Sequence, residues 1–363
     1  MAITNFTGTL NPNEVFGFIY NMIISQYVYA DNVKGTYSSL VDKARVDGTL
    51  YGDTKLYYDV DVLQTHNWNT DSSMETNVLE LDRPNDPVCQ MITLDKFRQI
   101  RLTVDNYLTK RAWSTEGAFR DFNSVMLKMI RDTKRVYDST LYNTFIGTNE
   151  TTIGEQSYDI NAVAGQNDAL TMAEALADLL VKLKDVSREY NDNEFLKSFD
   201  ESDLMVVWNA KHYNTLKKID MPVIFHKDGL LNEFEQEVLP ARYFGTVKGA
   251  TTNNVVGDGQ TIRSLVERDV QNGGGDASAV HVFPGDLIPA GYNIPENECY
   301  VVDDTIAFKV IHKRSVPYMS AFEVATSFFN PRSLTENNYL TFGHNTLEHL
   351  AGYPFITARF VEA

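Results

Sequence analysis

One unusually long helix is predicted over residues 115–146, which read TEGAFRDFNSVMLKMIRDTKRVYDSTLYNTFI. The fold class depends mainly on this helix. Ser114 or Thr115 can cap its start, Glu116 lies in the first turn, and Gly147 follows its end. Apolar side chains recur on one stripe at helical spacing, namely Phe119, Phe122, Val125, Met126, Met129, Val136, Tyr137, Leu141 and Phe145. The helix would be roughly 45 Å long at 1.5 Å per residue. Since that exceeds the usual helix of a globular domain, we expect it to serve as a scaffold.

The residues before this helix indicate an arm and a long hairpin. Residues 1–52 mix apolar positions with Asn, Gly and Thr, and their best periodic part predicts a helix over Asn13–Tyr29. Apolar and polar side chains alternate over Asp53–Trp68 and again over Val88–Leu108, with a polar stretch between them. Such alternation is typical of half-buried strands. We therefore predict an extended arm, followed by a β-hairpin that projects from the body.

The residues after the helix predict an α/β middle portion and a strand-rich end. A polar linker, residues 149–167, precedes an amphipathic helix over Thr171–Tyr190. A buried strand over Leu204–Trp208 then leads into a helix over Ala210–Ile219, and two Gly-rich breaks follow at 256–260 and 271–277. Further strands are predicted at Val280–Phe283, Glu298–Val302, Ile306–His312, Ala321–Ala325 and Phe355–Phe360, with a turn at 329–335. The fold class is therefore α+β.

Composition excludes several classes of protein. The 363 residues are 43% hydrophobic, which is enough to build a sizeable core, and the formal net charge of −17 disfavours sequence-specific binding to nucleic acid. Cys89 and Cys299 are the two cysteines, so neither a disulfide framework nor a zinc or iron–sulfur motif is expected. The apolar segment Val15–Val28 is too short and too polar to cross a bilayer. Neither a signal peptide nor contact with a membrane is predicted, and the reducing cytoplasm is the expected compartment.

The sequence gives little support for a catalytic role of any residue. Asp303 and Asp304 offer a pair of carboxylates, but a turn between two apolar strands explains them better. His344, Glu348 and His349 are close in sequence, yet the two histidines are not spaced to share one face of a zinc-binding helix. The glycines at 257–259 and 273–275 lack the context of a phosphate loop, and Cys89 has no identifiable His partner. We predict no catalytic residue, no cofactor and no metal site, and hence no enzyme.

The order of these parts resembles the major capsid proteins of tailed bacteriophages, which share the Hong Kong 97 fold. The most similar local sequences are DLMVVWNAKHYNTLK, residues 203–217, and the two stretches FEVAT, 322–326, and GYPFITARF, 352–360. The resemblance implies an N-terminal arm (1–52), an extended loop (53–113), a peripheral domain built on the long spine helix (114–160) with return strands (299–363), and an axial domain (161–298).

The resemblance also implies a function and partners. The chain would assemble as hexamers and pentamers into the icosahedral or prolate head of a virion that encloses double-stranded DNA. Scaffolding, portal and decoration proteins would be its partners, and assembly would take place in the host cytoplasm. An encapsulin-like cellular compartment with the same fold remains an alternative. An acidic cytoplasmic enzyme whose site is not recognised is a further one.

The hairpin carries the candidate contact residues. An isolated two-stranded ribbon cannot keep so many aromatic side chains exposed, so we expect a neighbouring copy to cover them. Asp59 and Asp61, with the further acidic residues Asp71, Glu75, Glu80 and Asp82 of the same loop, would complement the basic return strand of a neighbour. The candidate inter-subunit residues are Tyr57, Tyr58, Trp68, Phe97, Arg98, Arg101 and Tyr107.

Two sets of basic residues leave alternatives open. Lys128, Arg131 and Arg135 share one face of the long helix, which either lines the interior and meets packaged DNA through unspecific phosphate contacts or is a solvated surface. Some relatives cross-link a lysine to an asparagine of the next subunit, and Lys55 stands at a suitable place. An ordinary solvated lysine is the alternative there.

Overall fold

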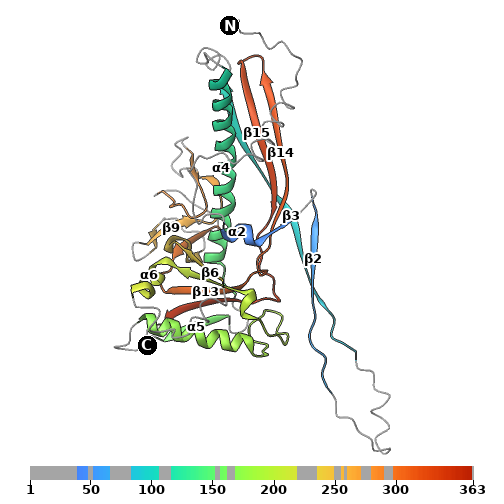
Figure 1. Ribbon diagram of the computed structural model, residues 1–363, viewed down its shortest axis with the longest axis vertical. Helices are drawn as coiled ribbons and strands as arrows, with labels where there is room; N and C mark the ends of the chain where they lie inside the picture. Colours follow the sequence, from blue (N-terminus) through green and yellow to red (C-terminus); the bar gives the residue numbers. More distant parts are fainter. Residues whose placement is uncertain are drawn as a thin grey trace, which may run out of the picture. The chain divides into compact units, whose positions relative to one another are not determined.

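A computed structural model of the chain describes residues 39–47, 52–65, 83–105, 116–151, 156–161, 168–218, 235–248, 255–256, 260–270, 279–289 and 297–361. The chain divides into two compact units, shown as ribbons in Figure 1. The first comprises Met1–Asp53, Thr93–Asn143 and Tyr318–Leu347. The second comprises Thr54–Ile92, Thr144–Pro317 and Glu348–Ala363.

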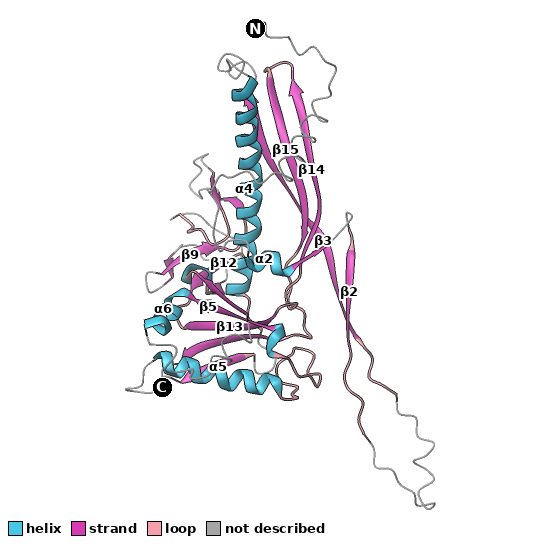
Figure 2. Ribbon diagram, in the orientation of Figure 1, coloured by secondary structure: helices cyan, strands magenta, loops and turns pink. Residues whose placement is uncertain are grey.

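The first unit is a sheet packed on the predicted long helix. Its elements are α2 (Ser39–Ala44), β1 (Arg45–Asp47), β14 (Tyr318–Asn330), β15 (Thr335–Asn345) and the larger parts of β3 (Val88–Asp105) and α4 (Glu116–Thr148), whose residues 88–92 and 144–148 belong to the second unit. The strand order is β1-β14-β15-β3, with β1 parallel to β14 and the other pairs antiparallel. In Figure 2, β14, β15 and β3 run alongside α4.

Alternation along the strands decides which side chains meet the helix. Ile100, Leu102, Leu340, Phe342 and Ala325 form a core with Ile130, Tyr137 and Leu141 of α4. Because successive side chains point to opposite faces of a sheet, the other face carries Arg101, its cross-strand neighbour Tyr339, and the exposed Val324 and Phe328. We call this second face the outer sheet face.

The second unit is centred on a mixed five-stranded sheet. The strand order is β4 (Ser157–Asn161), β16 (Phe355–Val361), β13 (Ile306–His312), β5 (Leu204–Asn209) and β6 (Glu235–Leu239). Helix α5 (Asp168–Lys184) packs its apolar stripe on this sheet, and α6 (Ala210–Lys218) follows β5. All six residues of β5 are buried, as expected of a continuous apolar run in a central strand. This unit also holds β2 (Thr54–Asp59), which lies beside the start of β3.

Smaller elements complete the second unit. One sheet has the order β7 (Gly245–Lys248), β12 (Cys299–Val302), β9 (Gln260–Ser264) and β8 (Val255–Val256), and another pairs β10 (Arg268–Val270) with β11 (Val280–Val282). Short 3-10 helices lie at Glu201–Asp203 and Ala241–Tyr243. Ile262, Val270, Val282 and Val301 contribute to the core of this region.

The helix predictions hold with shifted ends. Helix α4 covers the predicted Thr115–Ile146 almost completely, but Gly147 lies inside it rather than after it. A Cβ on Gly147 would stand 2.1 Å from the main-chain oxygen of Tyr243, so the glycine serves close packing of two backbones. Helix α5 begins at Asp168 and ends at Lys184, before the predicted Tyr190. The helix predicted over Asn13–Tyr29 lies outside the described residues.

The strand predictions need several corrections. Strand β4 lies inside the predicted polar linker, residues 149–167, and β6, β7, β9 and β10 were not predicted. The predicted strand over Asp53–Trp68 is too long. Strand β2 ends at Asp59, and the described residues 60–65 that follow it are not in a strand. The predicted turn at 329–335 is the tight connection between β14 and β15, but β15 itself was not predicted. Among the helices of the described residues, none combines the length and the apolar content that a membrane span requires.

Candidate functional site

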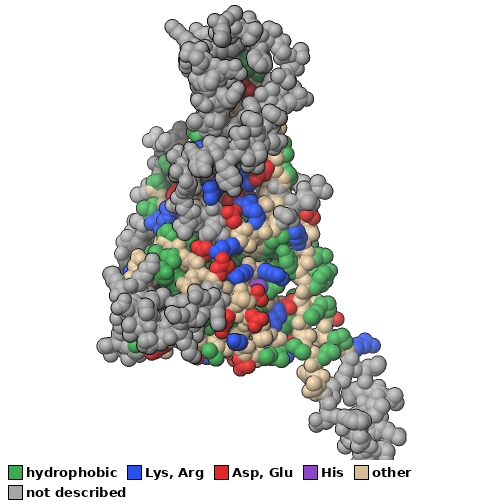
Figure 3. All heavy atoms as spheres, viewed as in Figure 1, with side chains coloured by type: hydrophobic (Ala, Val, Ile, Leu, Met, Phe, Trp, Pro, Cys, Tyr) green, Lys and Arg blue, Asp and Glu red, His purple; other side chains and the backbone are tan. Residues whose placement is uncertain are grey.

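The described part of the extended loop turns its apolar face outward. Tyr58 and Val60 are 67% and 65% exposed, and Leu56 and Val62 on the same side are also exposed. The alternate side chains Lys55, Tyr57, Asp59 and Asp61 are partly buried instead. Figure 3 shows hydrophobic side chains gathered along the strand pair at the right edge of the view. The apolar loop face, defined by Leu56, Tyr58, Val60 and Val62, is therefore unburied within this chain.

Asp59 fastens the polar face of the loop to the second unit. Its carboxylate lies 2.6 Å from Nζ of Lys197 and accepts a 2.6 Å hydrogen bond from Nδ2 of Asn193. Lys197 also donates to the main-chain oxygen of Gly352 at 2.8 Å. The three groups are partly buried, so water competes with them only in part.

Asp61 makes the second attachment. It accepts hydrogen bonds from the main-chain N–H of Leu196 at 3.0 Å and from Nη1 of Arg188 at 2.8 Å. The Leu196 N–H, followed by the guanidinium of Arg188, holds the pKa of Asp61 below its ordinary value. Arg188 also donates to the main-chain oxygen of Glu194, which has a positive φ of 54°. We call Asp59, Asp61, Arg188, Asn193 and Lys197 the loop clamp.

The return strand of the loop has its own attachment. Gln90 of β3 donates its amide N–H to the main-chain oxygen of His349 at 2.8 Å and accepts from the N–H of Ala351 at 3.0 Å. Polar groups thus hold both strands of the loop at their base. The side chains of the apolar loop face take no part in these hydrogen bonds.

A cavity of about 280 Å³ lies at the base of the loop. Leu56, Tyr58 and Val88 line it from the loop, and Phe199, Leu350 and Tyr353 line it from the rest of the second unit. Burial, with a smaller contribution from Tyr353, raises the pKa of Tyr57 in its wall. We call this cavity the loop pocket.

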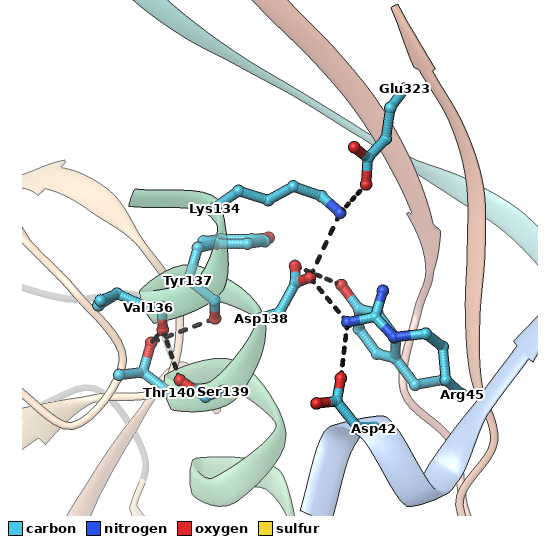
Figure 4. Close-up of polar contacts among 10 residues, drawn as sticks. Asp42, Arg45, Lys134, Val136, Tyr137, Asp138, Ser139, Thr140 and Glu323 are labelled. Carbon is cyan, nitrogen blue, oxygen red and sulfur yellow. Dashed lines mark hydrogen bonds and ion pairs between the residues drawn. The ribbon is translucent and has the colours of Figure 1, made fainter. Parts of the chain in front are cut away.

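The last described part of the N-terminal arm is attached through Asp138. This carboxylate of α4 is 2% exposed and accepts a 2.7 Å hydrogen bond from the hydroxyl of Tyr318. Arg45 lies 3.5 Å away and Lys134 3.6 Å away, and Lys134 also pairs with Glu323 of β14 (Figure 4). Arg45 and Tyr318 are register partners in the β1–β14 pair. Burial and the neighbouring Asp138 raise the pKa of Tyr318 well above its ordinary value.

His344 lies in the same core as a neutral side chain. Its Nε2 is 2.7 Å from the hydroxyl of Tyr137, and its Nδ1 is 2.8 Å from the main-chain oxygen of Asn345. Burial lowers the pKa of His344, which favours the neutral ring. Because a carbonyl oxygen can only accept, Nδ1 carries the ring proton and donates to Asn345, and Nε2 accepts a hydrogen bond from the hydroxyl of Tyr137. His349 instead lies near Asp192 and Tyr353. Within the described residues, no three His, Cys, Asp or Glu side chains are grouped to hold a metal ion.

Comparison with known proteins identifies the family. The sequence model of the Phi29-like phage major capsid proteins matches residues 3–346. The chain belongs to this family. No curated protein sequence matches the chain.

Solved capsid structures share the fold. A chain in the capsid structure of Staphylococcus phage Andhra has a TM-score of 0.58 at 11% identity, covering 99% of this chain and 94% of that one. A chain in the structure of head fiber and inner core protein gp22 of native bacteriophage P68 has a TM-score of 0.60 at 13% identity, covering 99% and 91%. A chain of the bacteriophage PhiM1 mature capsid has a TM-score of 0.50 at 8% identity, covering 100% and 93%. The likeness at these identities is one of fold.

As a phage major capsid protein, the chain is a structural component of the virion and lies in the head shell. Its family consists of structural proteins and not of enzymes. The mixed α/β fold matches that of phage capsid proteins, as the resemblance implied.

The predicted contact residues of this capsid protein lie in different environments. Tyr58 is exposed on the apolar loop face, whereas Tyr57 is partly buried, and both line the loop pocket. Phe97 stacks on Phe322 with a centroid separation of 5.9 Å. Trp68 and Tyr107 lie outside the described residues.

The two predicted arginines lie on opposite faces of β3. Arg98 faces α4, where Nε donates to the hydroxyl of Tyr137 at 3.3 Å and the guanidinium lies over the tyrosine ring. Arg101 lies on the outer sheet face and donates to Gln99 at 3.1 Å. The expectation that Asp59 and Asp61 pair with a neighbour's basic strand is wrong, because Lys197 and Arg188 of the same chain already hold them.

The three predicted DNA-facing cations differ in exposure. The side chain of Lys128 is only 13% exposed and lies 3.9 Å from Asp132, whereas Arg131 and Arg135 are exposed. The row of three is thus reduced to two exposed arginines on α4.

The weak catalytic candidates have structural roles. Asp303 accepts hydrogen bonds from the N–H and hydroxyl of Thr305, which forms the predicted turn, and Asp304 pairs with Lys211 at 2.8 Å. Cys89 is exposed and Cys299 is buried. The glycines at 257–259 and 273–275 lie outside the described residues.

Sequence reasoning missed the residues that attach the loop and the arm. Lys197, Asn193 and Arg188 are more than 120 positions from the aspartates they meet, and no local pattern indicates such a contact. Asp138 carried a weak signal, because it is an acidic residue next to the apolar stripe of a long amphipathic helix.

Proposed function

We propose that this capsid protein assembles with copies of itself, as hexamers and pentamers, into a closed head shell around double-stranded DNA. In this proposal its parts follow the Hong Kong 97 arrangement: arm 1–52, extended loop 53–113, peripheral domain 114–160 with return strands 299–363, and axial domain 161–298. Scaffolding, portal and decoration proteins would be its other partners.

The exposed apolar loop face carries the proposal. Side chains such as Leu and Val each stabilise by about 1.5–3 kcal/mol when fully buried. A two-stranded ribbon gains none of this while its apolar face meets water. The loop clamp holds the polar face against the chain's own second unit, so the apolar face is presented in a fixed direction.

The outer sheet face of a second copy offers a complementary surface. Val324 and Phe328 are exposed there beside Tyr339 and Arg101, and aromatic residues and Arg are enriched at protein interfaces. Loop and sheet are different surfaces, so each copy gives one and receives the other. Head-to-tail contacts of this kind close into rings when the rotation allows. Arg131 and Arg135 supply cations for unspecific phosphate contacts in the interior.

The double variant Tyr58→Asp/Val60→Asp tests the shell. We expect soluble subunits with unchanged circular dichroism and unfolding midpoint, but no closed particles by electron microscopy. Val181→Asp is the matched control, because Val181 on α5 is equally exposed and lies in the same unit. Normal particles from the double variant would refute the role of the apolar loop face. Nuclease-resistant DNA in purified native heads tests the content, and heads without it would contradict the DNA proposal.

A further inference from the structure

The turn between β14 and β15 carries a second group of exposed apolar side chains. Phe328 is 62% exposed and Leu334 is 48% exposed, and Phe329 beside them is also exposed. They fall within seven residues of one hairpin. We call Phe328, Phe329 and Leu334 the hairpin tip.

Both the backbone conformation and the exposed side chain of Leu334 cost free energy in the isolated chain. Its φ is 53°, in the left-handed region that glycine and asparagine adopt readily and that a leucine does not. Polar groups build the turn, since the N–H of Arg332 donates to Asn330 at 3.0 Å and the hydroxyls of Ser333 and Thr335 lie 2.7 Å apart. With the turn built from these polar groups, the exposed half of the leucine side chain is available to contact something outside this chain.

The loop pocket is a suitable receptor for such a side chain. Leu56, Tyr58, Val88, Phe199, Leu350 and Tyr353 give its lining aliphatic and aromatic surface, and the polar Asp59, Gln90, Asn193 and Lys197 line it beside them. A cavity of about 150 Å³ holds a benzene ring, so a pocket of about 280 Å³ has room for a phenyl ring and part of a neighbouring leucine. An apolar anchor inserted in a pocket is the usual centre of a protein interface.

We propose that the hairpin tip of one copy inserts into the loop pocket of a second copy, with Phe328 as the anchor and Leu334 beside it. The proposal rests on the shell function, because the shell supplies the second copy. Tip and pocket belong to different surfaces, so every copy both inserts its tip and receives one. Insertion would bury the apolar groups of both partners and would account for a strained leucine at the turn.

Disulfide trapping in assembled shells tests the contact. In a Cys89→Ser background, which leaves only the buried Cys299, Val88→Cys is placed in the pocket wall and Leu334→Cys on the tip. Mild oxidation of shells should give covalent dimers and longer ladders on non-reducing gels, with the 88–334 disulfide found by peptide mapping. Val181→Cys with Leu334→Cys is the matched control and should give no ladder.

Three outcomes would overturn the proposal. The first is the absence of an 88–334 disulfide in intact shells, and the second is an 88–334 disulfide within one chain. The third is the formation of dimers by Leu334→Cys alone, which would place one hairpin tip against another. A failure of the native chain to form shells would instead refute the shell function. As a second measurement, Phe328→Ala shells should dissociate at a lower guanidinium concentration than native shells. Thr326→Ala, on the same strand face, should not change that concentration, and an unchanged Phe328→Ala shell would contradict the anchor role.

Discussion

At the scale of single residues, Asp138 is the acceptor on which the arm attachment converges. Tyr318, Arg45 and Lys134 all contact it, and the carboxylate is almost fully buried. Removal of one partner from a buried charged network leaves the others without compensation. The polar side-chain contacts of the arm therefore meet at one carboxylate, in addition to the backbone pairing of β1 with β14.

Asp138→Asn should lower the free energy of unfolding of unassembled subunits by about 3 kcal/mol, because Tyr318 would lose its carboxylate acceptor and Arg45 and Lys134 would keep only their more exposed partners Asp42 and Glu323. Guanidinium denaturation followed by circular dichroism measures this. Asp42→Asn is the control, since Asp42 pairs with the same Arg45 at an exposed position and should cost less than about 1 kcal/mol. Equal losses in the two variants would show that Asp138 has no special role.

Lys309 predicts a dependence of stability on pH. It is fully buried and donates to the main-chain oxygen of Asn149 at 2.7 Å, just after the end of α4. Burial lowers its pKa to about 7, whereas the unfolded chain keeps the ordinary value of 10.5. Between these values the unfolded state holds a proton that the folded state lacks, so stability rises with pH, by up to about 1.4 kcal/mol per unit.

Lys309→Met should remove this dependence. The variant should be more stable than the native subunit at pH 7, where the buried charge costs most, and its advantage should shrink as the pH rises to 9.5. The lost hydrogen bond to Asn149 reduces the gain by about 1 kcal/mol. Urea denaturation of both subunits across this pH range is the measurement. A constant difference between them would mean that the amine does not titrate in this window.

At the scale of elements, the sequence predicted what local periodicity encodes. Helix α4 was predicted because its apolar stripe repeats from Phe119 to Phe145, and β5 because LMVVW is a short apolar run. Strand β15 was missed because TENNYLTFGHN contains three asparagines and a glycine, which are poor strand formers. Pairing with β14 on one side and β3 on the other overrides that preference.

In the extended loop, the sequence predicts which side chains share a face but not which of the two faces packs against the same chain. Alternation separated Leu56, Tyr58, Val60 and Val62 from Asp59 and Asp61 correctly, but it does not say which face the same chain covers. The answer depends on Lys197, Arg188 and Asn193, which are distant in sequence. The same limit applies to Arg98, whose contact with Tyr137 depends on how β3 packs on α4.

At the scale of the whole molecule, a shell protein must balance two demands on its loop. The subunit must stay soluble with the loop extended, and the loop must hold its direction when a second copy arrives. Clamping through the polar face meets both, because order gained before association lowers the entropic cost of binding. Exposed or partly exposed ion pairs are weak, at about 0.2–1 kcal/mol each, so the clamp orders the loop without contributing much to folding.

Asp59→Asn/Asp61→Asn should therefore spare folding and impair assembly. We expect an unchanged unfolding midpoint, amide hydrogen exchange of residues 54–59 faster by roughly tenfold, and a lower yield of closed shells by electron microscopy. Asp178→Asn, which removes a comparable pair with Lys182 on α5, is the control and should leave both exchange in the loop and shell yield unchanged. If exchange rises while shell yield stays at the native level, the neighbouring copy orders the loop by itself and the clamp has no part in assembly.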